Sequence, residues 1–199
     1  MKLLKENIDG LRKIHKLPEE LKNFLQDHDV QRALIDENID KIYRLFSGSS
    51  SRNRMMYSNA VYKLTYLLYS IGIDPLLYLN HVPDSFLRHS GIKSIVIPSN
   101  IISTGKRAFQ QCNNLTTVVI EDGVKVIDDY AFFDCAKLVD VTVPSSVENI
   151  GFFAFARCSQ LTSIHYTGTK QAWGAIRIDY NWKASSPITI HCIDGDINL

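Results

Sequence analysis

Hydrophobic residues in the second half of the chain recur at a fixed spacing of 23 residues. Four units begin at Ile92, Leu115, Leu138 and Leu161, and each opens with an L-x-x-I-x-I type of pattern. The last part of this pattern alternates apolar and polar residues and is rich in β-branched side chains, which predicts a short strand in every unit. A period of this length indicates a solenoid, in which one supersecondary unit stacks on copies of itself.

An Ala-Phe pair and a cysteine close each of the first three units. In a solenoid, equivalent positions form columns, so we expect the phenylalanine to fill the interior at every level while the alanine lets the backbone approach. Full burial of each ring should contribute about 1.5–3 kcal/mol. Core filling explains the spacing completely, so we favour it over a ligand slot. The positions are Ala108-Phe109, Ala131-Phe132 and Ala154-Phe155, with Cys112, Cys135 and Cys158.

The unit L-x-x-I-x-I-P followed by I-x-x-x-A-F-x-x-C, repeated over residues 92–160, resembles the BspA-type leucine-rich repeats of bacteria. Residues 168–176, Trp182 and residues 189–195 look like the closing segment of such arrays. The resemblance covers more than half of the chain and implies a leucine-rich-repeat solenoid with a parallel β-sheet. Members of the family serve mainly as recognition surfaces with diverse partners, so the resemblance implies binding without naming a ligand.

Both ends of the array depart from the repeat, as solenoids require to shield their terminal cores. In the fourth unit Arg177-Ile178 and Asn181 replace Ala-Phe and cysteine, which predicts a degenerate capping repeat. Before the first unit, Ser85, Phe86 and His89 align with the alanine, phenylalanine and cysteine positions and predict a half-repeat.

The first 80 residues change to the helical period, with a short last helix predicted from Pro75. The expected fold class is therefore α+β, with an N-terminal helical bundle that caps a short leucine-rich-repeat solenoid. The expected domains are a helical cap domain, 1–80, and the solenoid, 81–199, which comprises half-repeat 82–91, repeats 92–114, 115–137 and 138–160, and a degenerate capping repeat 161–199.

Two features of the helical region are secondary candidates for partner contact. Tyr62, Tyr66 and Tyr69 form one helical stripe, which fits either a core with its hydroxyls at the edge or an aromatic contact patch. Arg52 and Arg54 lie in a Ser-rich loop that is either simply solvated or a contact for a phosphate or an acidic protein.

The main candidate site is the outward face of the predicted parallel sheet, usually the concave binding face of such arrays. Residues between the buried strand positions should form two columns on this face. They are Ser94, Thr117, Asp140, Ser163 and Thr189 in one column, and Val96, Val119, Thr142, His165 and His191 in the other. His165 and His191 are expected to be neighbours, which fits a pH-dependent protein contact better than a metal site completed by Asp140.

Composition narrows the partner and the compartment. A formal net charge of +1 offers no electrostatic case for nucleic acid or an anionic membrane. We find no apolar run long enough for a membrane span and no secretory signal peptide in the first residues. The four cysteines fit a repeated column of reduced thiols better than disulfides, which predicts the cytoplasm of a bacterial cell or of a phage-infected host.

No catalytic motif, cofactor motif or metal-ligand spacing is present in the sequence. We therefore expect a non-enzymatic scaffold, without cofactor or metal, that covers the surface of another protein. A phage or mobile-element inhibitor of a host factor is one hypothesis, and a bacterial surface or adhesion-type recognition module is the alternative. A carbohydrate binder would need a cleft that a flat sheet lacks. The sequence specifies neither the partner nor the oligomeric state.

Overall fold

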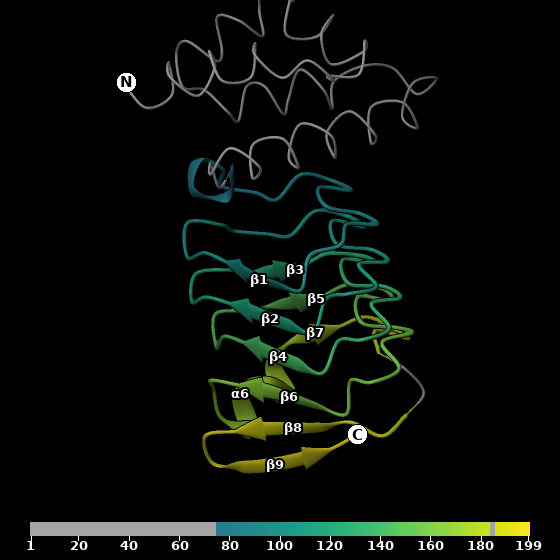
Figure 1. Cartoon of the computed structure of the whole chain (residues 1–199). Helices are drawn as coiled ribbons and strands as arrows, with labels where there is room; N and C mark the ends of the chain where they lie inside the picture. The colour runs from purple at the N-terminus through teal and green to yellow at the C-terminus, as the bar shows by residue number, and fades with distance from the viewer. Residues whose placement is uncertain (1–74, 184–185) are drawn as a thin grey trace, which may run out of the picture. The chain divides into compact units, whose positions relative to one another are not determined.

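The computed structural model describes residues 75–183 and 186–199 (Figure 1). The chain divides into two compact units, Met1–Leu79 and Asn80–Leu199. Of the first unit only the 3-10 helix η1 (Pro75–Tyr78) is described, at the place where a short helix is predicted. The predicted N-terminal bundle, with Tyr62, Tyr66, Tyr69, Arg52 and Arg54, lies outside the described residues.

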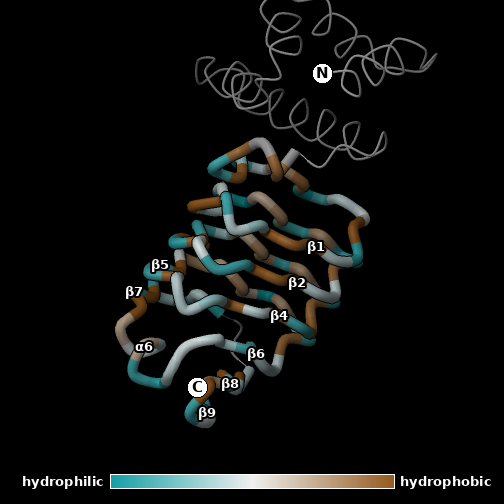
Figure 2. The backbone as a smooth tube through the Cα atoms, turned by 90° about the vertical axis from the view of Figure 1, so that its left-hand side faces the viewer, coloured by the Kyte–Doolittle hydropathy of each residue, from teal (hydrophilic) through white to brown (hydrophobic). Residues whose placement is uncertain are grey.

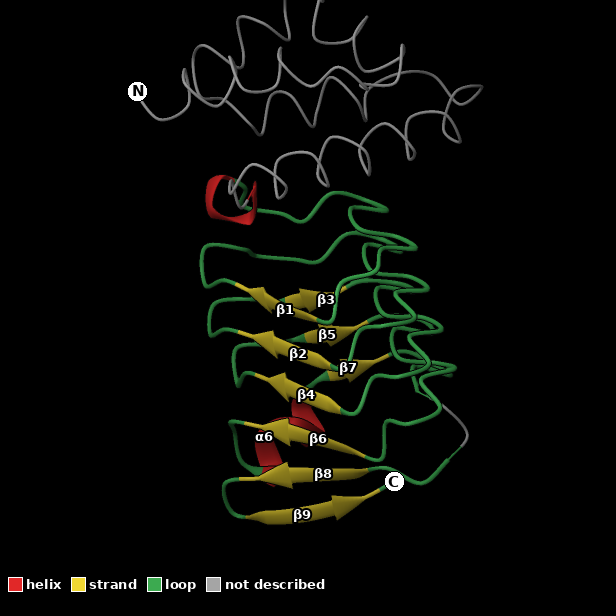
Figure 3. Cartoon of the chain, in the orientation of Figure 1, coloured by secondary structure: helices red, strands yellow, loops and turns green. Residues whose placement is uncertain are grey.

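The second unit is a short β-solenoid with two sheets (Figure 3). Strands of the larger sheet are all parallel except the last pair, which is antiparallel. In spatial order this sheet contains β1 (Ser94–Ile97), β2 (Thr117–Ile120), β4 (Asp140–Val143), β6 (Ser163–Tyr166), β8 (Thr189–Cys192) and β9 (Gly195–Asn198). The smaller parallel sheet contains β3 (Val126–Ile127), β5 (Asn149–Ile150) and β7 (Arg177–Ile178), and helix α6 (Lys170–Ala175) follows β6.

Strand pairing confirms the predicted solenoid and its register. Ser94 pairs with Thr117 and Thr117 with Asp140, so each strand lies beside its copy from the next unit. Every second residue of these strands is buried, because successive side chains of a strand point to opposite faces. Figure 2 shows the result, with hydrophobic segments at the same place in successive turns.

A column of phenylalanine rings fills the interior, as predicted. The rings of Phe109 and Phe132 stack with centroids 5.1 Å apart and planes 8° apart, and those of Phe132 and Phe155 stack at 5.2 Å and 9°. Phe86 packs edge-on against Phe109 at one end, and Trp182 packs edge-on against Phe155 at the other. All three stacked rings are fully buried. Stacking adds about 0.5–1.5 kcal/mol per ring pair to the stabilisation from burial.

The first partial turn is one residue out of the predicted register. The Ser90 hydroxyl lies 3.3 Å from the Cys112 sulfur, 22 residues away. Ser90 therefore occupies the cysteine column that the prediction gave to His89, and His89 is exposed. Similarly Leu87, not Phe86, takes the backbone position of the phenylalanines, since its amide donates to the Ala108 carbonyl. The register differs because the spacing between the half-repeat and the first full repeat is 22 residues. An alignment with a constant spacing of 23 residues therefore misplaces the half-repeat by one residue.

The last turn is longer than the others, which corrects the predicted capping repeat. Helix α6 is inserted after β6, and Arg177 then pairs with Asn149 of β5. Phe155 forms a bridge to Lys183. Arg177-Ile178 therefore forms the last strand of the smaller sheet and does not replace the Ala-Phe pair. The large indole of Trp182 closes the ring column in its place.

Left-handed backbone recurs at two positions of the repeat, one before and one after the central phenylalanine position. Glycine is the usual residue at positive φ, yet none of these positions is glycine. The first column, with φ between 55° and 59°, is Ser85, Arg107, Tyr130, Phe153 and Asn181. The second column, with φ between 59° and 61°, is His89, Gln111, Asp134 and Arg157. The fold therefore imposes this conformation whatever the side chain.

We predict that Phe132→Ala lowers the free energy of unfolding by about 3–5 kcal/mol, because it leaves a cavity between two stacked rings. Chemical denaturation followed by circular dichroism measures the change. Val139→Ala is the matched control, because Val139 is 47% exposed and its truncation should change stability by less than about 0.5 kcal/mol. Equal stability of both variants would contradict the stacking.

Candidate functional site

The predicted binding residues lie together on the outward face of the six-stranded sheet. In the second column, strand pairing joins Val96 to Val119, Val119 to Thr142, Thr142 to His165 and His165 to His191, without interruption. None of the residues in either column is buried. The side chains between them point into the core, because the burial pattern alternates along each strand.

The chemistry of this sheet face changes from one side to the other. In the second column, Val96 of β1 is 47% exposed and its partner Val119 is half-buried, so this end of the column is apolar, beside the polar Ser94 and Thr117 of the first column. Around β4 the exposed Asp140 introduces a carboxylate, and at β6 and β8 the two histidines introduce titratable rings. The strands of this face therefore pair without a break, while the side chains of the second column change from apolar at β1 and β2 to polar at β6 and β8.

The two histidines are neighbours, as the sequence predicts. The His165 and His191 rings stack with centroids 5.3 Å apart and planes 28° apart. The carboxylate in contact with His191 is that of Asp196, whose Oδ1 lies 2.9 Å from His191 Nδ1, and not the Asp140 considered from sequence. Within residues 75–183 and 186–199, no group of three or more His, Cys, Asp and Glu side chains could hold a metal ion.

Strand β9 extends the face and is absent from the sequence prediction. It pairs with β8 so that Asn198 lies beside Thr189 and Asp196 beside His191, adding a polar member to each column. The Asp194-Gly195 dipeptide is a common hairpin signal and could have revealed this strand. The period of 23 residues does not predict β9, because this strand has no copy in the other turns.

The cysteine column is structural. Cys112, Cys135 and Cys158 are buried and free, and their thiols donate to the carbonyls of Leu87, Phe109 and Phe132, each at 3.1 Å. The hydrogen-bonded Cys135 thiol and burial raise the pKa of Cys112 far above its ordinary value. For Cys135, the hydrogen bond with Cys112 lowers the pKa, but the Cys158 thiol and burial together outweigh this effect, so the pKa is raised overall. The thiols of Cys112 and Cys135 are therefore poor nucleophiles, because their thiolate forms are scarcely populated.

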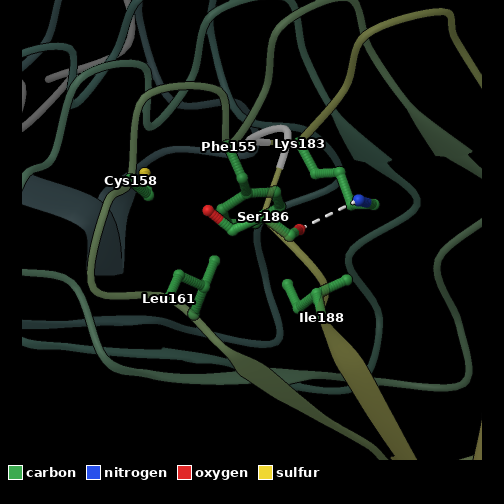
Figure 4. Close-up of a pocket in the computed structure, with 6 residues that line it drawn as sticks. All are labelled: Phe155, Cys158, Leu161, Lys183, Ser186 and Ile188. Carbon is green, nitrogen blue, oxygen red and sulfur yellow. Dashed lines mark hydrogen bonds between the residues drawn. The ribbon is translucent and has the colours of Figure 1, made fainter. Parts of the chain in front are cut away.

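A depression beside the last turn is lined by side chains from the segments between β5 and β6 and before β8 (Figure 4). Phe155, Cys158, Leu161 and Ile188 make it apolar, and the Lys183 ammonium donates to the Ser186 carbonyl at 3.2 Å. The depression does not admit even a water molecule, so it belongs to the packing of the core.

A comparison with family models matches residues 80–175 to the BspA type leucine rich repeat region, in six copies, and so confirms the resemblance for this part of the chain. No curated protein matches the sequence. Two solved structures are similar. A leucine-rich cell surface protein of Faecalibacterium prausnitzii is 25% identical, with a TM-score of 0.35 over 51% of this chain and 33% of that one. A leucine-rich repeat protein of Bacteroides ovatus is 22% identical, with a TM-score of 0.35 over 54% and 36% of the two chains.

We predict that native protein reacts with a thiol reagent only at Cys192, which is half-buried, whereas unfolded protein reacts at all four cysteines. Burial raises the pKa of Cys192 as well, so its reaction should be slower than that of an exposed thiol. Absorbance of the released chromophore measures the number and rate of reacting groups. Cys192→Ser should abolish the native reaction, and rapid labelling of the other three thiols would contradict their burial.

Proposed function

We propose that this chain, whose residues 80–175 are a BspA-type leucine-rich repeat region, is a non-enzymatic scaffold that binds another protein through the outward face of its six-stranded sheet. Leucine-rich repeats generally mediate protein interactions, which supports the class of partner. The observation that carries the proposal is the uninterrupted pairing of outward residues from Val96 to His191.

The open sheet face supports this choice of surface. In most proteins both faces of a parallel sheet are covered. Here Val96, an apolar residue in the middle of β1, is 47% exposed, and no residue on the outward side of β2, β4 or β6 is buried. A protein that covered this face would remove apolar surface from water at β1 and β2, which favours association.

The sheet face contains both apolar and polar side chains, as protein interfaces do, although here they lie on opposite sides. Such interfaces combine an apolar centre, depleted of charged residues, with a polar rim. On this sheet the valines occupy one side, and Asp140, Asp196 and the histidines occupy the other. Small-molecule sites, in contrast, are concave clefts that enclose most of the ligand. A broad, continuous face is therefore better suited to a protein surface than to a small ligand.

For the compartment, we propose an intracellular location. Free thiols at all four cysteines support it, because disulfides form and persist mainly in oxidising compartments. Among the described residues, no helix has the length and apolarity needed to cross a membrane. Inhibition of a host factor by a phage or mobile-element product is a hypothesis drawn from the sequence.

We predict that Val96→Arg abolishes partner binding and leaves the melting temperature unchanged. A long, charged side chain in the apolar part of the face should prevent close contact, whereas the exposed site tolerates it within about 0.5 kcal/mol. The matched control is Ile102→Arg, because Ile102 is 45% exposed and lies outside the sheet. The measurement is affinity purification from the native host with quantitative mass spectrometry of wild type and both variants. A partner captured equally by all three proteins would rule out the sheet face.

We also predict that fractionation of the native host finds the protein in the cytoplasmic fraction. Immunoblotting of cytoplasmic, membrane and extracellular fractions measures its distribution, with a cytoplasmic enzyme as the control for lysis. Recovery mainly from the cell surface would overturn the intracellular proposal and favour the adhesion-type module, which would use the same sheet face on an extracellular partner.

A further inference from the structure

Four half-buried aromatic residues form a cluster in the loops that follow β3 and β5. Figure 3 shows these loops stacked on one another in successive turns. Tyr130 lies at its centre, with ring centroids 5.4 Å from Phe133, 5.8 Å from Phe152 and 5.4 Å from Phe153. Phe133 and Phe152 also contact Phe153, at 6.1 Å and 4.1 Å. These rings are separate from the fully buried column of Phe109, Phe132 and Phe155, because they lie at other positions of the repeat and retain exposure to solvent.

Two arginines cover this cluster. The guanidinium carbon of Arg107 lies 5.0 Å from the centre of the Tyr130 ring, and that of Arg157 lies 5.7 Å from the centre of the Phe133 ring. Both arginines are exposed. Contact with a ring face orients a guanidinium group without using up its N–H donors, so these donors stay available to an acceptor. We call Arg107, Tyr130, Phe133, Phe152, Phe153 and Arg157 the aromatic–arginine patch.

The carboxylates near the patch are already engaged by other groups. Asp129 accepts hydrogen bonds from the Lys106 ammonium at 3.1 Å and from the Phe152 amide at 3.0 Å. Asp134 accepts one from the Gln111 side chain at 3.2 Å. Within the described part of the chain, no carboxylate lies within ion-pair distance of Arg107 or Arg157. The patch therefore presents two positive charges that the fold does not neutralise.

The backbone does not require these large side chains. Arg107, Tyr130 and Phe153 stand in one column of left-handed residues, with φ of 58°, 57° and 55°. A bulky side chain is unfavourable in this conformation, and asparagine tolerates it better. The last turn indeed has Asn181 at this position. Aromatic rings kept at an unfavourable backbone position are a reason to look for a role beyond folding.

We propose that the aromatic–arginine patch is a second interaction surface, which binds a segment of another protein in which acidic residues flank an apolar side chain. The rings would contact the apolar side chain, and Arg107 and Arg157 would each pair with a carboxylate. Tyrosine and arginine are the residues that most often dominate the energy of protein interfaces. Paired charges at both ends would fix the direction of the bound segment, since guanidinium groups bind carboxylates with defined geometry.

This second surface is independent of the sheet face. Its residues come from the segments between β1 and β2, after β3 and after β5, whereas the sheet face uses outward residues of β1, β2, β4, β6 and β8. If the experiments disprove binding at one surface, the proposal for the other surface is unaffected. Variants of each surface can therefore serve as controls for the other.

The test uses a displayed library of random linear peptides, selected on the full chain at moderate ionic strength. We expect the enriched peptides to carry Asp or Glu on both sides of an aromatic or aliphatic residue. For the best peptide, fluorescence anisotropy gives the dissociation constant. The double variant Arg107→Glu/Arg157→Glu should weaken binding by at least about tenfold, because buried charge pairs at interfaces commonly contribute that much. Arg177→Glu is the matched control, because Arg177 is exposed on β7, outside the patch, and it should bind as wild type.

Removal of the rings is tested with Tyr130→Asn and Phe153→Asn, which keep a residue suited to left-handed backbone. Their melting temperatures show whether the fold is retained, and a folded variant should bind the peptide more weakly. Val96→Arg should bind the peptide normally. The proposal is overturned if no peptide is enriched, if the enriched peptides lack acidic residues, or if the charge-reversed protein binds as tightly as wild type. Loss of the peptide in Val96→Arg would also overturn it, because the peptide would then occupy the sheet face.

Discussion

The stack of phenylalanine rings at the centre of each turn is the interaction on which the rest of the solenoid depends. The ring centroids are 5.1 Å and 5.2 Å apart, close to the distance of about 4.8 Å between paired strands. The same rise from one turn to the next therefore suits both the stacking of the rings and the backbone hydrogen bonds between strands. The amide of Phe109 donates to the Ala131 carbonyl and that of Phe132 to the Ala154 carbonyl, both at 2.8 Å. Core and backbone thus enforce the same pitch, and the outward positions are aligned as a consequence.

The central turns could be predicted from sequence because each residue there has copies above and below it. Ser94, Thr117 and Asp140 pair as expected since the same spacing repeats on both sides. The ends could not be predicted in this way. The step before the first full turn is one residue shorter, which moves Ser90 into the cysteine column, and α6 lengthens the last turn. A terminal turn has another copy of the repeat on one side only, so packing between copies tolerates a change in length there that would break the ring column in the middle.

The aromatic–arginine patch could not be predicted from the sequence, because its residues do not follow the repeat. Its members do not repeat, since one backbone position carries Arg107, Tyr130 and Phe153 in successive turns. A repeated sequence pattern identifies the interior positions, because every turn needs the same kind of side chain there. It does not identify functional positions on the exterior, because each turn can carry a different side chain there. The array thus separates two tasks. Buried columns determine the shape, and exposed columns on the same backbone are free to vary in charge and size. The sheet face and the patch are two such exposed regions.

The reversed direction of β9 has a consequence for assembly. Every earlier strand of the larger sheet runs parallel to its neighbour, whereas β9 folds back on β8. A sheet edge with unpaired backbone groups is a template for the addition of further chains. Another molecule that approached this end with a repeat of its own would meet a strand of the opposite polarity, beneath a ring column already closed by Trp182. The hairpin therefore interrupts the run of parallel strands, so a further repeat could not continue the sheet at β9 with the parallel pairing of the earlier turns.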